Sequence, residues 1–412
     1  MKSFAFSLIL AATLPLTACV NNGGGGSGDA VNAENFDFVG MLANYADNII
    51  VPNYETLAND TATLAAAQGP LGLYCDAIGS AGEADARASA QQAWKSTMDA
   101  WQATTLHELG PIQANNNALR NRISAFTRGT TLSTCGVDQA VVLADTNPSF
   151  SLSGRSANQR GLGAVEYLLF NDSLAHTCPS QITETADWNE RPEQERKQLR
   201  CAYAEKLATD IDQAAQRVVG AWQIDADNYR SQFLNPAALD TNLKALSDAL
   251  FFLDTDTKDA KLGIPLGISA ACSQVSCPEV IESPFAQYSL NNISINVQSF
   301  LRLLEGGNGL GFDDIIAQAG VPEVTELMRE NSNAAIEEID TMTLSLRQQV
   351  EGIANEEDAQ ACVDAANTPD GERSRPACNL FGYIRRVTDT LKVGFVAAVD
   401  VDLPDRAQSD ND

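Results

Sequence analysis

Residues 290–307 read LNNISINVQSFLRLLEGG, and the spacing of the apolar residues in this stretch decides the fold class. Leu290, Ile293, Val297 and Leu304 recur at helical spacing, with Phe300 and Leu301 between them, so they form one apolar stripe. The stripe ends at two glycines, 306 and 307, which are typical of a helix terminus. The sequence therefore predicts a long amphipathic helix here.

The same period runs through most of the chain. Trp94, Met98 and Trp101 share one face of a second helix, and a stripe over 39–57 contains Pro52, where we expect a kink or a break. Alternating strand patterns are few and short. Further helices are expected over 196–223, 236–254, 322–352 and 379–398.

These patterns predict an all-α protein of two packed helical bundles, each resembling a four-helix bundle, with disulfide-bearing loops. Polar residues after Trp222 mark a boundary between the halves. The expected units are a lipoprotein signal peptide over 1–18, a flexible Gly-rich tether over 19–34, an N-terminal bundle over 35–225, a C-terminal bundle over 226–405 and an acidic tail over 406–412.

The chain begins with the features of an exported lipoprotein. Lys2 precedes an apolar stretch too short to span a bilayer, and Leu16-Thr17-Ala18-Cys19 resembles the lipobox in which the cysteine is lipidated. The alternative is an ordinary secretory signal with a chance cysteine. Val20, where an aspartate often retains lipoproteins at the inner membrane, favours the outer membrane facing the periplasm, with the cell surface as the alternative.

The cysteines fit an oxidising compartment. Nine are present, and setting Cys19 aside leaves an even number. Cys272/Cys277 and Cys362/Cys378 are close in sequence, so we expect these two bridges. For the remaining four the pairing Cys75/Cys135 and Cys178/Cys201 is one of several that spacing allows.

A net charge of −27 argues against nucleic acid or anionic lipid as a partner. An acidic surface attracts cations or cationic peptides, but it also simply keeps an exported protein soluble. Lipid contact is therefore expected only through the anchor. We also expect a monomer, with other envelope proteins as its partners.

Catalytic motifs are scarce. The sequence has no HExxH, no GxSxG and no zinc-finger spacing, and its two histidines are His107, near a helix end, and His176, near Asp172 and Cys178 in a loop. We expect His107 to be a capping or surface residue rather than a ligand, and His176 to be equally unremarkable.

One carboxylate stands within the apolar run RGLGAVEYLLF, residues 160–170. In a helix, Gly163, Glu166, Tyr167 and Phe170 share a face, so Glu166 should be at least partly buried. A buried carboxylate must be paired, hydrogen-bonded, protonated or bound to a cation. Glycines 161 and 163 weaken a helix, so each is expected to have a steric reason. The candidate ionic partners of Glu166 are Arg155, Arg160 and Lys261.

This run resembles the signature of the imelysin family, in which a G-x-H-x-x-E motif leads into E-Y-L-L-F. Other segments resemble the family in the same order: NYADNIIVPNYETL (44–57), AWKSTMDAWQATTLHELGP (93–111), DAKLGIPLG (259–267), IESPFAQYSLNNI (281–293) and LKVGFVAAVDVD (391–402). The resemblance covers residues 35 to 403.

The chain departs from the family motif at one point. Gly161 and Glu166 match, but Gly163 stands at the histidine position, and Thr105 stands where members often carry an acidic residue. A glycine supplies no metal ligand. The resemblance implies a pocket between the halves that contains Gly161, Gly163, Glu166, Tyr167, Glu282 and Ser283. A cation site would rest on Glu166 and Glu282, with iron or another divalent cation as the candidate cofactor.

Three functions follow. The resemblance favours a non-catalytic binding lipoprotein associated with iron or metal uptake. The first alternative is a metallopeptidase of the imelysin type, with Glu166 as ligand or general base and His107 replacing the missing histidine. The second is a structural or interaction module of the envelope in which Glu166 is salt-bridged. The sequence names no catalytic residue, and the lost histidine argues against an enzyme.

Overall fold

The computed structural model describes residues 36–126, 130–371, 375–399 and 404. The described chain is all-α and contains no strand. The predicted signal peptide, the tether, Cys19 and the acidic tail lie outside the described residues. No described helix is both long enough and apolar enough to span a membrane.

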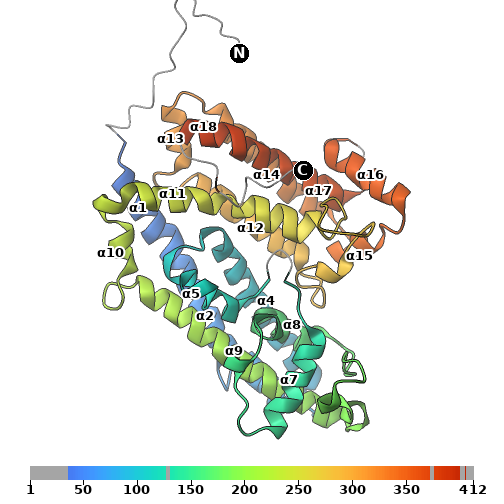
Figure 1. Cartoon of the computed structure of the whole chain (residues 1–412). Coiled ribbons are helices and arrows are strands. Elements are labelled where there is room, and N and C mark those ends of the chain that lie inside the picture. Colours follow the sequence, from blue (N-terminus) through green and yellow to red (C-terminus); the bar gives the residue numbers. More distant parts are fainter. Residues whose placement is uncertain (1–35, 127–129, 372–374, 400–403, 405–412) are drawn as a thin grey trace, which may run out of the picture.

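Figure 1 shows two groups of helices, with α12 crossing the middle of the molecule. The lower group is built on α2, α4, α8 and α9, and the upper group on α12, α14 and α17. Helices α4 and α12 pack against each other and join the two groups. The boundary at 225/226 between two bundles stays a prediction.

The first group contains α1 (Phe38–Tyr45), α2 (Val51–Ala65), α3 (Pro70–Ala77), α4 (Glu83–Thr104), α5 (Ala114–Asn117), α6 (Arg120–Ile123), α7 (Thr134–Thr146), α8 (Gly161–Phe170) and α9 (Glu193–Trp222). After the predicted boundary the chain forms α10 (Tyr229–Phe233), which packs on α9, and then α11 (Leu239–Leu250), α12 (Ser289–Leu304), α13 (Phe312–Gln318), α14 (Glu323–Thr341), α15 (Leu346–Glu351), α16 (Glu356–Asn367), α17 (Pro376–Thr390) and α18 (Val396–Val399).

The apolar stripe of 290–307 forms a buried helix face on α12, as its spacing predicts. Ile293, Val297, Phe300 and Leu304 of α12 are fully buried. The same helix also buries polar residues, because Ser289, Asn292 and Asn296 lie beside the stripe and face the interior. α12 therefore supplies both core and polar contacts at the junction of the two groups.

Several predicted helices differ in their course. The helix expected over 322–352 divides into α14 and α15, and the one expected over 379–398 contains a π-helical segment, Leu391–Phe395. Ahead of Pro52 the chain does not break; a π-helical turn, Ala46–Ile50, lies between α1 and α2 and keeps the backbone helical. A wider turn accommodates a proline, which lacks an N–H and crowds the preceding turn. The expected helix over 236–254 ends at Leu250, and a second π-helical segment, Leu253–Gly263, follows it.

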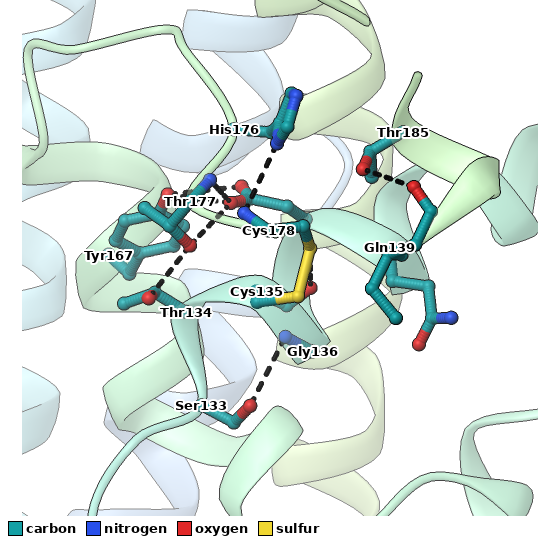
Figure 2. Close-up of a disulfide and its surroundings, with 12 residues drawn as sticks. Ser133, Thr134, Cys135, Gly136, Gln139, Tyr167, His176, Thr177, Cys178 and Thr185 are labelled. Carbon is teal, nitrogen blue, oxygen red and sulfur yellow. Dashed lines mark hydrogen bonds between the residues drawn. A yellow bond between two sulfur atoms is a disulfide. The ribbon is translucent and has the colours of Figure 1, made fainter. Parts of the chain in front are cut away.

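All eight cysteines outside the signal region form disulfides. The bridges Cys272–Cys277 and Cys362–Cys378 are confirmed. The suggested pairing Cys75/Cys135 and Cys178/Cys201 is wrong, because the structure pairs Cys75 with Cys201 and Cys135 with Cys178. The first bridge links α3 to α9, which pack side by side, and the second links α7 to the loop after α8 (Figure 2).

Candidate functional site

Helix α8 holds the carboxylate at the centre of the candidate site. It packs between α4 and α9, and Trp94 Nε1 of α4 donates to the Leu162 carbonyl at 2.9 Å. Its first residue, Gly161, has φ +75, and a Cβ there would lie 2.8 Å from the Ile123 carbonyl oxygen. Only glycine fits this entry into the helix without strain.

Gly163 differs from Gly161. It has no positive φ, and the nearest neighbouring atom to a Cβ at this position is Leu132 Cδ1 at 3.8 Å, an ordinary contact. The expected steric reason is therefore found for Gly161 and not for Gly163. A side chain at 163 would extend into a cavity rather than into protein.

The Glu166 side chain is 1% exposed and has no ionic partner within the described residues. Its Oε1 accepts the backbone N–H groups of Phe285 and Ala286, both at 2.8 Å. Burial raises the pKa of Glu166 from its ordinary 4.5 to about 8, the two amides lower it, and nearby Glu282 raises it. At neutral pH the side chain is mainly a neutral carboxylic acid, which is one of the four expected states of a buried carboxylate.

The three cations expected to pair with Glu166 lie elsewhere. Arg155 contacts the Gly136 carbonyl and Gln139, and Arg160 reaches only the Leu152 carbonyl, at 3.5 Å. Lys261 pairs with Glu282 at 3.0 Å. The predicted ion pairs of Glu166 are therefore wrong.

Glu282 anchors the loop that supplies the two amides. Gln102 donates to its Oε1 at 3.0 Å, and Asn292 and Lys261 contact its Oε2 at 2.9 and 3.0 Å. Ser289 Oγ holds the Glu282 carbonyl. Both carboxylate oxygens are therefore already occupied by protein partners.

A buried polar network supports this anchor. Lys261 comes from the π-helical segment and donates to Gln102 Oε1 and Asn296 Oδ1 at 2.6 and 2.7 Å. Asn296 Nδ2 returns to Thr105 Oγ1 at 2.9 Å, so the threonine at the expected acidic position is a hydrogen-bond partner. The residues Gln102, Asn292 and Asn296 were missed by sequence reasoning. The i, i+4 spacing of two asparagines beside an apolar stripe was the signal that could have found the last two.

A cavity of about 310 Å³ lies beside Glu166. Of the six residues that the resemblance implied for a pocket, Gly163, Glu166, Glu282 and Ser283 line this cavity, whereas Gly161 and Tyr167 do not. Tyr167 instead donates its hydroxyl to Asp138 at 3.0 Å, next to the Cys135–Cys178 bridge (Figure 2). Ser283 has a left-handed backbone, φ +53, at the turn that presents the amides.

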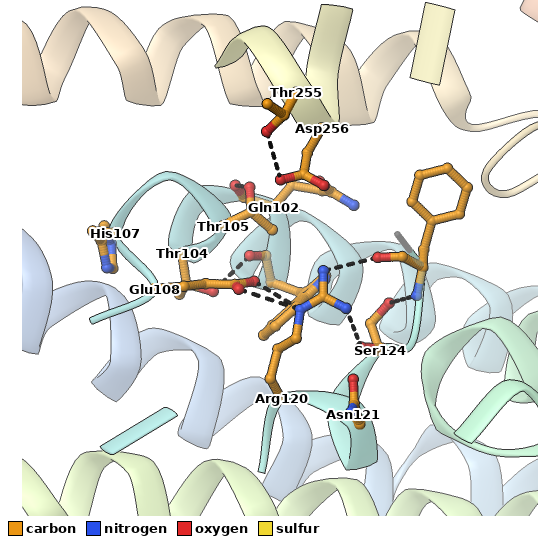
Figure 3. Close-up of polar contacts among 12 residues, drawn as sticks. Gln102, Thr104, Thr105, His107, Glu108, Arg120, Asn121, Ser124, Thr255 and Asp256 are labelled. Carbon is orange, nitrogen blue, oxygen red and sulfur yellow. Dashed lines mark hydrogen bonds and ion pairs between the residues drawn. The ribbon is translucent and has the colours of Figure 1, made fainter. Parts of the chain in front are cut away.

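A second buried ion pair fixes another wall of this cavity. Arg120 Nε lies 3.2 Å from both oxygens of Glu108, and its Nη1 and Nη2 donate to the carbonyls of Ser124 and Phe126 at 3.2 and 2.8 Å (Figure 3). Ser124 and Phe126 line the cavity. The pair therefore positions the chain that faces helix α8.

Neither histidine lines the cavity. His107 is fully buried, which corrects the capping or surface role expected for it, and its Nε2 lies 2.9 Å from Asn53 Nδ2. Burial lowers the His107 pKa to about 4, so the ring is neutral. Its ring packs edge-on against Tyr54 and does not line the cavity beside Gly163. His176 lies in the expected loop, where its Nδ1 accepts the Cys178 N–H.

The side chains present do not fit a bare divalent cation. Gly163 has no side chain to act as a ligand, and Glu282 is paired with Lys261. The Oε1 atom of Glu166 already accepts two backbone N–H groups. Within the described residues no three His, Cys, Asp or Glu side chains are grouped closely enough to hold a metal ion. The metal role predicted for Glu166 and Glu282 finds no support in their contacts.

The fold and the site define a class of all-helical proteins with an internal carboxyl cavity between two helical groups. The imelysin family model matches residues 50–371, and the chain belongs to this family. None of the curated proteins matches the chain.

Two solved structures share the fold. An imelysin-like protein from Psychrobacter arcticum 273-4 has a TM-score of 0.57 at 16% identity, over 89% of this chain and 96% of the other. A candidate iron-regulated protein A precursor from Parabacteroides distasonis ATCC 8503 has a TM-score of 0.56 at 12% identity, over 86% of this chain and 95% of the other. At these identities the likeness concerns the fold alone.

The two glycines of α8 should respond oppositely to alanine. Gly161→Ala is expected to lower the free energy of unfolding by about 2 kcal/mol or more, because it combines a positive φ with a clash. Gly163→Ala should raise it by about 0.5–1 kcal/mol, because alanine favours the helix and nothing blocks it. Urea unfolding of the two variants and the wild type measures both. A destabilised Gly163→Ala would contradict the open space at that position.

The titration of Glu166 should appear in the pH dependence of stability. The folded pKa of about 8 lies above the ordinary 4.5, so the folded state holds the proton more tightly and loses stability as pH rises between these values. Relative to Glu166→Gln, the wild type should lose about 3 kcal/mol between pH 5 and pH 8. Urea unfolding at several pH values checks this. The control is Glu279→Gln at the exposed edge of the cavity, whose profile should follow that of the wild type.

Proposed function

We propose that this imelysin-family chain is a non-catalytic binding protein of the bacterial envelope, and that its ligand occupies the Glu166 cavity. One observation carries the proposal: a cavity of about 310 Å³ borders a buried carboxyl group, and glycine at 163 leaves room in place of a metal ligand. This volume falls in the range of small-molecule sites.

The absence of catalysis is part of the proposal. A metal-dependent peptidase needs a metal ligand set and an activated water. The contacts of Glu166 and Glu282 offer no such set, and the buried His107 lies against Asn53 and Tyr54 instead of the cavity. A buried neutral acid is suited to hydrogen bonding with a ligand.

The proposed role is in iron acquisition, by a protein anchored to the outer membrane. The iron link is supported by the name of the related iron-regulated protein from Parabacteroides distasonis and by family membership. The lipid anchor at Cys19 is supported by the lipobox-like sequence. In this proposal the protein faces the periplasm and is a monomer. Other envelope proteins are the proposed partners.

Ligand capture tests the binding function. The wild type and Gly163→Leu are produced in iron-limited and iron-replete bacteria, purified and denatured, and the released small molecules are identified by mass spectrometry. We expect the wild type to release a near-stoichiometric organic compound under iron limitation. Gly163→Leu should release little, because the new side chain fills the cavity.

A matched control separates cavity filling from a general effect of leucine. Gly220 lies on α9, with nothing within 4 Å of an added Cβ, so Gly220→Leu should retain the ligand. Equal release from all three proteins, or none from any, would contradict the proposal. In the same cells, Cys19→Ser should abolish palmitate labelling and membrane retention, and labelling that persists would refute the anchor.

A further inference from the structure

The walls of the Glu166 cavity are mainly apolar. Phe126, Leu132, Ile281 and Phe285 line it. A hydrated ion gains nothing from such walls, whereas an organic body that covers them removes apolar surface from water. The occupant best suited to these walls therefore has an apolar body.

One cation at the cavity has unused hydrogen-bonding capacity. Arg160 lines the cavity and has no ion pair within the described residues, and its buried Nε lacks any acceptor there. The only hydrogen bond of its side chain within the described residues goes to the Leu152 carbonyl, at 3.5 Å. An unsatisfied buried guanidinium N–H is costly, and a ligand carboxylate would satisfy it.

Two other cations near cavities, Arg347 and Lys197, are already paired. Arg347, also at this cavity, bonds Glu351 at 2.8 Å. In another cavity, of about 380 Å³ beside α9, Lys197 contacts Glu83 and Glu193, both at 2.8 Å. Arg196 of that cavity resembles Arg160, because its side chain bonds only the Leu174 carbonyl and its Nε lacks an acceptor among the described residues. The Glu166 cavity therefore differs in that its unpaired guanidinium group lies beside mainly apolar walls.

The acidic groups at the cavity do not oppose an anion. Glu282 is neutralised by Lys261, and Glu279 is exposed to solvent. Burial raises the pKa of Glu166 to about 8, so this group is mainly uncharged at neutral pH and its free Oε2 is able to donate a hydrogen bond.

We propose that the cavity binds an amphiphilic organic anion, whose carboxylate meets Arg160 and whose apolar body lies against Phe126, Leu132 and Phe285. This inference rests on the proposed binding function and names the chemical class of its ligand. It replaces the bare cation that the family resemblance implies.

Three probes with the same apolar chain test the inference. Purified full-chain protein is titrated calorimetrically with decanoate, decanol and decylammonium below their micelle concentrations. We expect one decanoate to bind per chain, about tenfold more tightly than decanol, because a hydrogen bond between charged groups adds to the shared apolar contact. Decylammonium should bind more weakly than either.

Two variants localise the binding. Arg160→Gln should remove the advantage of decanoate over decanol, and Gly163→Leu should weaken both by filling the cavity. Arg217→Gln removes an exposed cation of α9 that does not line the cavity, and it should bind like the wild type. If Arg160→Gln fails to fold, Gly163→Leu and the ranking of the three probes still decide the question.

Decanol or decylammonium binding as tightly as decanoate would overturn the ligand class, although the binding function would stand. Decanoate binding that neither Arg160→Gln nor Gly163→Leu weakens would also overturn it, because the anion would then lie elsewhere. Failure of all three probes would overturn the inference, and ligand capture would then decide the binding function independently.

Discussion

The two hydrogen bonds from Phe285 and Ala286 to Glu166 Oε1 hold the candidate site together. They join α8, in the first group of helices, to a loop 119 and 120 residues later in the chain. This contact orients the carboxyl group towards the cavity and closes one side of that cavity with Phe285. The contact therefore links the arrangement of the two groups to the chemistry of the site.

The loop is held in turn by the Lys261–Glu282 pair and the amides around it. Removing one member of a buried ion pair typically costs about 3–5 kcal/mol, because the other charge is left uncompensated. The contacts of Glu282 and Glu166 show that the two carboxyl groups have different roles. Glu282 is paired with Lys261 and holds the loop in place, whereas Glu166 is neutral and open to the cavity on one oxygen. Two carboxylates predicted to share one cation therefore have different environments and different roles.

Local periodicity was enough to predict the fold class and the positions of most long helices, but not every helix end. The stripe of α12 and the tryptophan face of α4 depend on residues within a few turns, and both form as expected. The four distant cysteines depend instead on which helices become neighbours, and spacing carries no information on the packing of α3 against α9. The partner of Lys261 could not be predicted for the same reason, because it depends on where the π-helical segment Leu253–Gly263 packs. For the site, the sequence predicted the burial of Glu166, and the family resemblance implied a pocket beside it. It did not predict the hydrogen-bond partners of Glu166, because both are backbone amides, which every residue except proline carries.

The central claim is that Glu166 is a neutral acid at neutral pH in a cavity without a metal ligand set. The most direct test is a ¹³C NMR titration of the Glu166 side-chain carboxyl in selectively labelled protein, assigned by comparison with Glu166→Gln. The account predicts a midpoint near the pKa of about 8 that burial produces. A carboxyl group that is already ionised at pH 6, with a midpoint near the ordinary 4.5, would contradict it.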